Sequence, residues 1–179
     1  MKAYIYHIGL QVRAYPSYKQ NQIIRMNGGA SLFIYNRLVA VDKEMYQLKK
    51  TAQYSSTDMA RLLYLQDTYA NVRNLQNAIP FLFSKGIDSL MTANAIRNYR
   101  NAWNMYHKEP WHGIPGFHKK DNTYKYQTSC CYQPKKLNNP IGLYEGSVRF
   151  EDKNHLVLPL LGRIRIKGSK KSSINLDVI

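Results

Sequence analysis

Asparagine and arginine recur along residues 88–108 at a spacing typical of one face of a helix. Intervals of 3, 4, 3 and 4 residues separate five polar side chains: Asn94, Arg97, Asn101, Asn104 and Lys108. No acidic residue lies between Asp88 and Glu109. Amide and guanidinium groups offer paired hydrogen bonds to phosphates and base edges. We therefore predict a nucleic-acid-binding face made of Asn94, Arg97, Asn98 and Asn101; the alternative is a plain polar face of a helical bundle.

The charge of the whole chain favours the same class of partner. Among its 179 residues, 26 are Lys or Arg and 11 are Asp or Glu, a formal net charge of +15. Such a field destabilises a compact protein by self-repulsion unless a polyanion neutralises it. The 15 Tyr residues can stack on bases and bond to phosphates. Nucleic acid is the expected partner, ahead of a membrane surface or an acidic protein.

Further cations occur in short runs with Tyr between them. Lys119 and Lys120 lie in a loop, and residues 163–167 alternate charged and apolar side chains, as in a half-buried strand with a basic outer face. Repeated runs of one sign favour a groove that follows a nucleic-acid backbone. The further predicted contacts are Lys19, Asn36, Lys119, Lys120, Tyr124, Arg163, Arg165 and Lys167.

Residue patterns for catalysis or metal binding are missing from the sequence. Cys130 and Cys131 are adjacent, and no second pair exists to complete a zinc site. The five histidines have no zinc-ligand spacing, the acids are scattered, and no phosphate-binding glycine loop occurs. We expect no catalytic residues, no metal and no cofactor, and therefore no enzyme activity from this chain alone.

The expected location is cytoplasmic. Adjacent cysteines without other partners are typical of a reducing compartment. Residues 1–10 contain Lys2, His7 and Gly9, so they do not form the apolar core of a signal peptide. No stretch approaches the roughly 18 apolar residues of a membrane span. The sequence thus predicts a soluble protein that does not act on a membrane.

Elements that would position these residues can be predicted from periodicity. Residues 2–13 alternate as a strand, and a capping box at Ser17 and Gln20 predicts a short helix to about Met26. Gly28 and Gly29 are expected to break it before a second helix at 30–50, which gives the outline of a helix-turn-helix. Two more helices are predicted at 57–74 and 88–108, with a short apolar segment at 79–83. Strands are predicted at 124–132, 147–150, 155–160 and 162–167.

This order of elements predicts an α+β fold in which a helical bundle is inserted into a small β-barrel. The first strand is expected to pair with the later ones. The predicted domains are residues 1–15 as the first strand of the barrel, 16–109 as the bundle and 110–179 as the rest of the barrel.

Five short motifs occur in a recognisable order along nearly the whole chain. They are Tyr15-Pro16 followed by Gln20, Gly28-Gly29 followed by Tyr35-Asn36, Ala102-Trp103, the loop at 114–120, and the run from Leu158 to Ile166. In this order they resemble TnpB, the nuclease of a bacterial transposon family, and the related miniature type V CRISPR effectors. Two positions depart from the family pattern: Leu32 stands where an Arg is usual, and His118 where a Lys is usual.

The resemblance implies an oligonucleotide-binding-like barrel, the wedge domain, split around a helical recognition bundle. It implies that these parts hold a structured guide RNA, the guide–target hybrid and the double-stranded DNA target. The family cuts DNA with a RuvC-like domain and carries a zinc ribbon, and neither pattern is found in these residues. Three readings stay open: an RNA-binding and DNA-binding module, a helix-turn-helix regulator acting without RNA, and the non-catalytic half of a nuclease completed by a separate RuvC-bearing chain.

Overall fold

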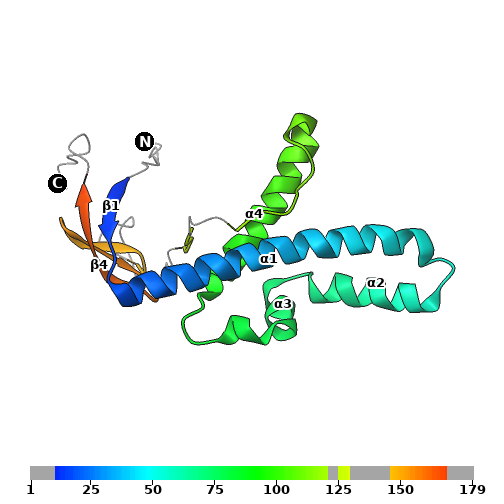
Figure 1. The fold of residues 1–179 in the computed structure, drawn as a ribbon, viewed down its shortest axis with the longest axis horizontal. Coiled ribbons are helices and arrows are strands. Elements are labelled where there is room, and N and C mark those ends of the chain that lie inside the picture. Colours follow the sequence, from blue (N-terminus) through cyan, green and yellow to red (C-terminus); the bar gives the residue numbers. More distant parts are fainter. Residues whose placement is uncertain (1–10, 121–124, 130–145, 169–179) are drawn as a thin grey trace, which may run out of the picture. The chain divides into compact units, whose positions relative to one another are not determined.

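The computed structural model describes residues 11–120, 125–129 and 146–168. The chain divides into two compact units, one formed by residues 1–20 and 130–179 and the other by residues 21–129. The first unit contains a β-sheet and the second is helical (Figure 1). The predicted α+β class is confirmed. No helix of the described residues is long and apolar enough to cross a membrane.

Helix α1 (Tyr18–Thr51) begins at the predicted capping box and runs for 34 residues. The Ser17 amide donates to Gln20 Oε1 at 2.8 Å, and the Gln20 amide donates to Ser17 Oγ at 3.3 Å. These reciprocal bonds satisfy amides that the first turn of a helix leaves without partners.

The predicted helix break at Gly28-Gly29 is wrong, because α1 continues through both glycines. A glycine inside a helix costs only about 1 kcal/mol relative to alanine, which tertiary packing readily outweighs. The packing here starts at Asn27, which is fully buried and bonds to three backbone groups: Ile23 O, Gly86 O and the Asp88 amide. Ala30 and Ile34, one and two turns further on, are buried in the core.

The other helices are α2 (Ser56–Thr68), α3 (Val72–Ala78), α4 (Ser89–Lys108) and the 3₁₀ turns η1 (Pro80–Phe83) and η2 (Pro110–His112). The helix predicted at 57–74 is in fact two helices, because the side chain of Asn71 accepts the Asn74 amide and starts α3. Helix α2 runs beside α1 (Figure 1), and Arg61 Nε lies 2.7 Å from Glu44 Oε1 across the pair. Among the described residues, a hydrophobic cluster of the helical unit contains ten buried side chains: Ala30, Ile34, Leu38, Val39, Leu75, Leu82, Met91, Ala95, Ile96 and Tyr99.

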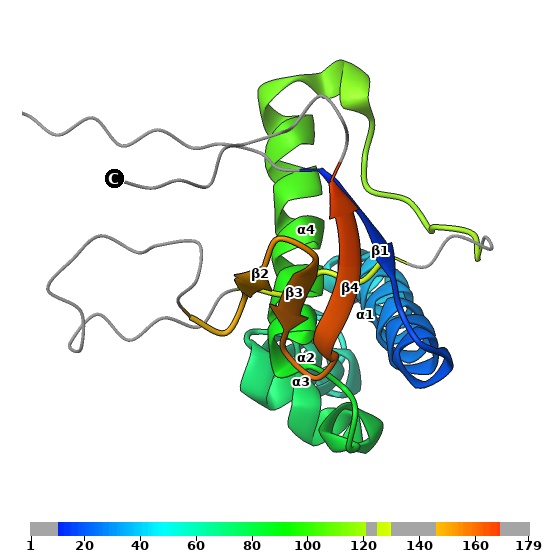
Figure 2. The same ribbon diagram turned by 90° about the vertical axis from the view of Figure 1, so that its left-hand side faces the viewer.

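The sheet has four antiparallel strands in the order β1-β4-β3-β2 (Figure 2). They are β1 (Val12–Tyr15), β2 (Arg149–Asp152), β3 (His155–Leu158) and β4 (Gly162–Gly168). The predicted pairing of the first strand with a later one is confirmed, since β1 pairs with β4. Gln20 Nε2 donates to the carbonyls of Leu161 and Arg163, both at 2.8 Å, and so joins the start of α1 to β4.

The predicted barrel is not found among the described residues, where the sheet is open. Strands β1 and β2 form its two edges, and four short strands are too few to close a sheet on itself. Of the strand predicted at 124–132, residues 125–129 form no strand, and the remainder lies outside the described residues. Residues 2–10 of the first predicted strand also lie outside them.

Candidate nucleic-acid interface

One face of the sheet is cationic. Along β4, Ile164 and Ile166 are buried, whereas Arg163, Arg165 and Lys167 are exposed. Side chains alternate between the two faces of a strand, so the three cations share the outer face, as predicted.

Strand β1 adds two side chains to this face that the sequence interpretation missed. Arg13 is opposite Lys167, and Tyr15 is opposite Arg165. Residues directly opposite in an antiparallel pair lie on the same face. The alternation of side chains along residues 12–15, before Pro16, could have indicated that Arg13 and Tyr15 share a face. The β1–β4 register, however, is what places Arg13 beside Lys167. We call Arg13, Tyr15, Arg165 and Lys167 the cationic sheet face.

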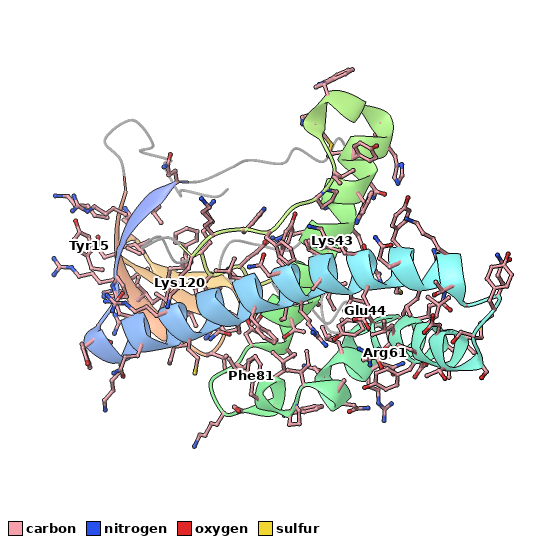
Figure 3. All side chains as sticks on the ribbon, turned by 45° about the vertical axis from the view of Figure 1, so that its right-hand side comes forward. Tyr15, Lys43, Glu44, Arg61, Phe81 and Lys120 are labelled. Carbon is pink, nitrogen blue, oxygen red and sulfur yellow. The ribbon has the colours of Figure 1, made fainter. Side chains whose placement is uncertain are left out.

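Two guanidinium groups lie close to the ring of Tyr15, the residue of this face that Figure 3 labels. Arg13 Cζ is 5.5 Å and Arg165 Cζ is 5.9 Å from the centroid of its ring. The tyrosine side chain is 43% exposed. An exposed aromatic ring flanked by cations combines a stacking surface with phosphate-binding charge, which is how many proteins bind single-stranded nucleic acid.

Arg163 differs from its neighbours because two acids neutralise its charge. Its Nε is 2.6 Å from Glu151 Oε2, and its Nη2 is 3.3 Å from Asp152 Oδ2. The pKa of Asp152 is lowered, first by the hydrogen bond from the Asn154 amide and then by His155. Arg163 was predicted to contact phosphates, but in the structure its guanidinium is already held by carboxylates.

The loop at 113–120 is attached to α1 through the motif Tyr35-Asn36. Asn36 Nδ2 donates to His118 O at 2.9 Å, and the His118 amide donates to Asn36 Oδ1 at 2.8 Å. The ring of Tyr35 stacks on that of His118, with centroids 4.1 Å apart. Asn36, a predicted nucleic-acid contact, thus uses its amide to hold the loop, and Lys119 and Lys120 follow it as exposed residues.

The polar stripe of α4 is only partly available. Asn94 is 2% exposed, and its Nδ2 donates to Ser129 Oγ at 3.1 Å. Asn98 is exposed, but its Nδ2 donates to Gln127 Oε1 at 2.7 Å. The prediction that Asn94 faces solvent is therefore wrong, because residues 125–129 cover the beginning of the stripe.

Arg97 and Asn101 lie on the uncovered part of the stripe. Both are exposed, and their side chains make no hydrogen bond to another described residue. The opposite stripe behaves as predicted, since Ile96 and Tyr99 are each 5% exposed. Lys19 is exposed on the first turn of α1, and Tyr124 lies outside the described residues.

Acidic side chains of the described residues mostly have structural partners. Asp42 accepts hydrogen bonds from Tyr99 and Trp103, and Asp88 caps α4 and accepts the hydroxyl of Tyr126. The described part of the chain contains no group of three His, Cys, Asp or Glu residues suited to a metal ion.

Residues 3–51 match the family model of the helix-turn-helix domain of IS605 OrfB proteins. The match covers about a quarter of the chain and associates its amino-terminal segment with DNA binding in a transposon-associated protein. Within the match, the structure describes β1 and α1; the next helix, α2, follows after the turn at residues 52–55. No curated protein matches the chain.

Proposed function

We propose that this chain is the nucleic-acid-binding module of a TnpB-like, RNA-guided system, and that it binds a structured guide-like RNA and the double-stranded DNA target. The observation that carries the proposal is the cationic sheet face, where the exposed ring of Tyr15 lies close to the guanidinium groups of Arg13 and Arg165 and shares the face with Lys167. Exposed rings stack on unpaired bases, which a folded RNA presents in its loops. The adjacent cations would neutralise the phosphates on either side of a stacked base.

The loop held by Asn36 supports a second region of contact. Its backbone is fixed by two hydrogen bonds, so Lys119 and Lys120 extend from a positioned segment. A preorganised contact loses less conformational entropy on binding than a mobile one. Arg97 and Asn101 on α4 add two groups that can bond to phosphates or base edges.

The proposal assigns no catalytic step to this chain. RuvC-type cleavage uses two metal ions, which require clustered carboxylates. Here Asp42, Asp88 and Asp152 already accept hydrogen bonds from neighbouring protein groups. Cleavage would then require a RuvC domain from outside residues 1–179.

The first experiment measures bound nucleic acid and its salt dependence. The purified protein should carry RNA, visible as a raised ratio of absorbance at 260 and 280 nm. Affinity for that RNA should fall linearly with the logarithm of salt concentration. The same protein, with its RNA, a matched plasmid and Mg²⁺ or Mn²⁺, should leave the plasmid intact. Metal-dependent cleavage that co-elutes with the chain would contradict the assignment.

A helix-turn-helix regulator acting without RNA is the second candidate, and the family match favours it. The two candidates differ in the effect of ribonuclease. A regulator that acts without RNA should bind duplex DNA with the same affinity before and after the protein is treated with ribonuclease. An RNA-guided module should lose sequence-directed binding after the same treatment. Gel-shift assays on one DNA target, before and after digestion, decide between them.

A further inference from the structure

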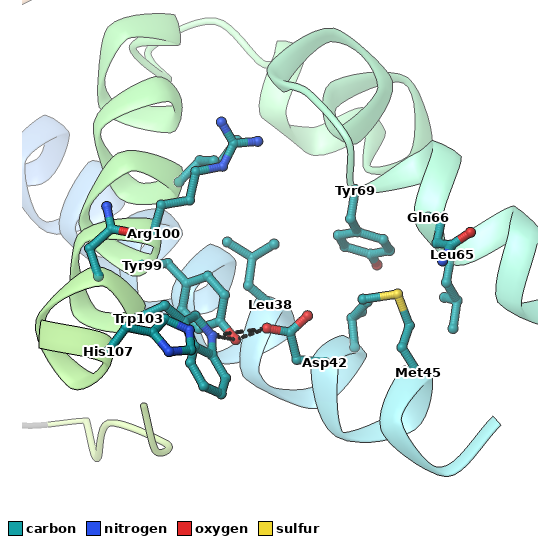
Figure 4. A pocket seen from close by; sticks show the side chains of 13 residues that line it. Leu38, Asp42, Met45, Leu65, Gln66, Tyr69, Tyr99, Arg100, Trp103 and His107 are labelled. Atoms are coloured by element: carbon teal, nitrogen blue, oxygen red, sulfur yellow. Dashed lines mark hydrogen bonds between the residues drawn. The ribbon is translucent and has the colours of Figure 1, made fainter. Parts of the chain in front are cut away.

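The helical unit contains a pocket of about 510 Å³ between α1, α2 and α4 (Figure 4). Its volume lies within the roughly 300–1,000 Å³ typical of small-ligand sites. None of the nucleic-acid contacts assigned above lines it. Aliphatic side chains form part of its lining, and four rings contribute to it as well, those of Tyr69, Tyr99, Trp103 and His107.

Asp42 lines this pocket with one oxygen occupied and one free. Its Oδ2 accepts the hydroxyl of Tyr99 and the indole Nε1–H of Trp103, the latter at 3.0 Å. Burial, and then the bond to Asp42, raises the pKa of Tyr99, so the phenol stays a donor at neutral pH. A carboxylate has about four acceptor positions. Oδ1 has no hydrogen-bond partner among the described residues and can accept from a ligand.

The rings give the pocket stacking surfaces. His107 lies against Trp103 with their ring centroids 5.7 Å apart and their planes 25° apart. Tyr69 comes from the other side, where α2 ends, and Arg37 Nε holds its hydroxyl at 2.7 Å. A flat aromatic ligand would contact Trp103 or Tyr69 and reach Asp42 with its edge.

Cations beside the pocket select the charge of the ligand. Arg100 lines it and donates one bond, from Nη2 to Ala70 O at 2.9 Å, which leaves further N–H donors of its guanidinium. Arg37 lies next to Tyr69. In a chain of net charge +15, these groups disfavour an organic cation and favour a ligand that carries phosphate.

We propose that this pocket binds one unstacked nucleobase of a bound strand, with an amino-bearing base, guanine above all, donating to Asp42. Guanine offers adjacent N1–H and N2–H donors, and the acceptor positions that Asp42 has left are those of Oδ1. In uracil and thymine, two carbonyl oxygens flank the single N–H donor and would face the carboxylate unfavourably. The proposal rests on the proposed nucleic-acid-binding function and assigns that function a base-reading site.

The test uses the fluorescence of Trp103 in protein carrying Trp111→Phe, which removes the other tryptophan. GMP and UMP are titrated separately, and GMP should quench Trp103 with at least about tenfold higher affinity. Asn104 and Met105 are adjacent exposed residues of α4, but only Asn104 lines the pocket. Asn104→Phe should fill part of the pocket and abolish quenching, whereas Met105→Phe should retain it.

A second arm distinguishes a base within a strand from a free nucleotide. A thymidine oligonucleotide with one central guanine should bind more tightly than the all-thymidine oligonucleotide, and Asn104→Phe should remove that difference. Equal affinity for GMP and UMP, or unchanged quenching in Asn104→Phe, would overturn the proposal. A GMP preference without a strand preference would also overturn it, in favour of a free-nucleotide site. If GMP does not quench Trp103 in the Trp111→Phe protein with an intact pocket, but salt-dependent RNA binding is retained, the pocket proposal alone is refuted. If RNA binding is also absent, the proposed function is refuted as well.

Discussion

The cationic sheet face and the polar stripe of α4 are both candidate nucleic-acid-binding surfaces, but they differ in how many of their side chains remain available. On the sheet, Arg165 and Lys167 stay exposed beside Tyr15. On α4, Asn94 and Asn98 bond to the segment 125–129. A strand alternates strictly between its two faces, so every second residue is presented together. A helix face is broader, and another segment can cover part of it.

The two surfaces differ mainly in whether their polar side chains are already bonded to other parts of the protein. Amide side chains have both donors and acceptors and readily bond to neighbouring backbone or side chains. Arginine and lysine only donate, and the 26 cations of this chain outnumber its 11 carboxylates, although Arg61 and Arg163 do pair with acids. Asn36 and Asn94 accordingly hold segments of the protein together, while the unpaired cations are left for an external polyanion.

The largest effect is expected from substitutions in the exposed part of the α4 stripe. The double variant Arg97→Ala with Asn101→Ala should weaken nucleic-acid binding by about 1–3 kcal/mol for each base edge that it no longer reaches. Its melting temperature should stay unchanged, because both residues are exposed. Binding isotherms and thermal unfolding measure the two quantities. Wild-type affinity in this variant would leave the stripe as ordinary surface.

The covered part of the stripe should behave in the opposite way. Asn94→Ala removes buried hydrogen bonds and should lower the free energy of unfolding by about 1–3 kcal/mol. Urea unfolding measures this change, with Asn101→Ala as the matched control on the same helix, expected to lie within about 0.5 kcal/mol of wild type. Equal stability of the two variants would show that the segment 125–129 does not cover Asn94.

On the sheet, the paired and unpaired arginines should separate in a salt series. Arg13→Ala with Arg165→Ala should reduce the slope of log affinity against log salt by about 0.7–0.9 for each phosphate that is no longer neutralised. Arg163→Ala should change the slope less, because Glu151 and Asp152 already neutralise its charge. Lys119→Ala with Lys120→Ala tests the loop in the same assay. Slopes equal to wild type in both double variants would show that these cations do not contact phosphates and serve only to keep the protein soluble.

The smallest effect should come from releasing Arg163. Glu151→Gln with Asp152→Asn frees its guanidinium and should steepen the slope by less than about 0.9. Mild acid should not reproduce this release for Asp152, whose folded pKa lies below its ordinary value near 3.9. Its carboxylate is therefore still charged at about pH 5, and it becomes neutral only as pH falls through that lowered pKa. A steeper slope for wild type at pH 5, with no change in the double variant, would argue against this pairing.

Several features of the chain could be predicted from its sequence because they depend on local periodicity and charge. The alternation along 163–167, the capping box at Ser17 and the apolar stripe containing Ile96 and Tyr99 all occur as predicted. Each of them involves residues a few positions apart, where the spacing alone fixes the shared face. The excess of cations likewise predicts a polyanionic partner, nucleic acid first, without any knowledge of the fold.

The tertiary structure decided what depends on residues far apart in the chain. Packing of Asn27 against residues 86–88 helps carry α1 through two glycines, although local propensity predicts a break. Strand register brings Arg13 and Tyr15 beside β4, although the two strands are far apart in the sequence. Tertiary packing also determined which polar side chains stay free to bind a partner. The hydrogen bond between Asn94 and Ser129, for example, forms only when these distant segments pack together.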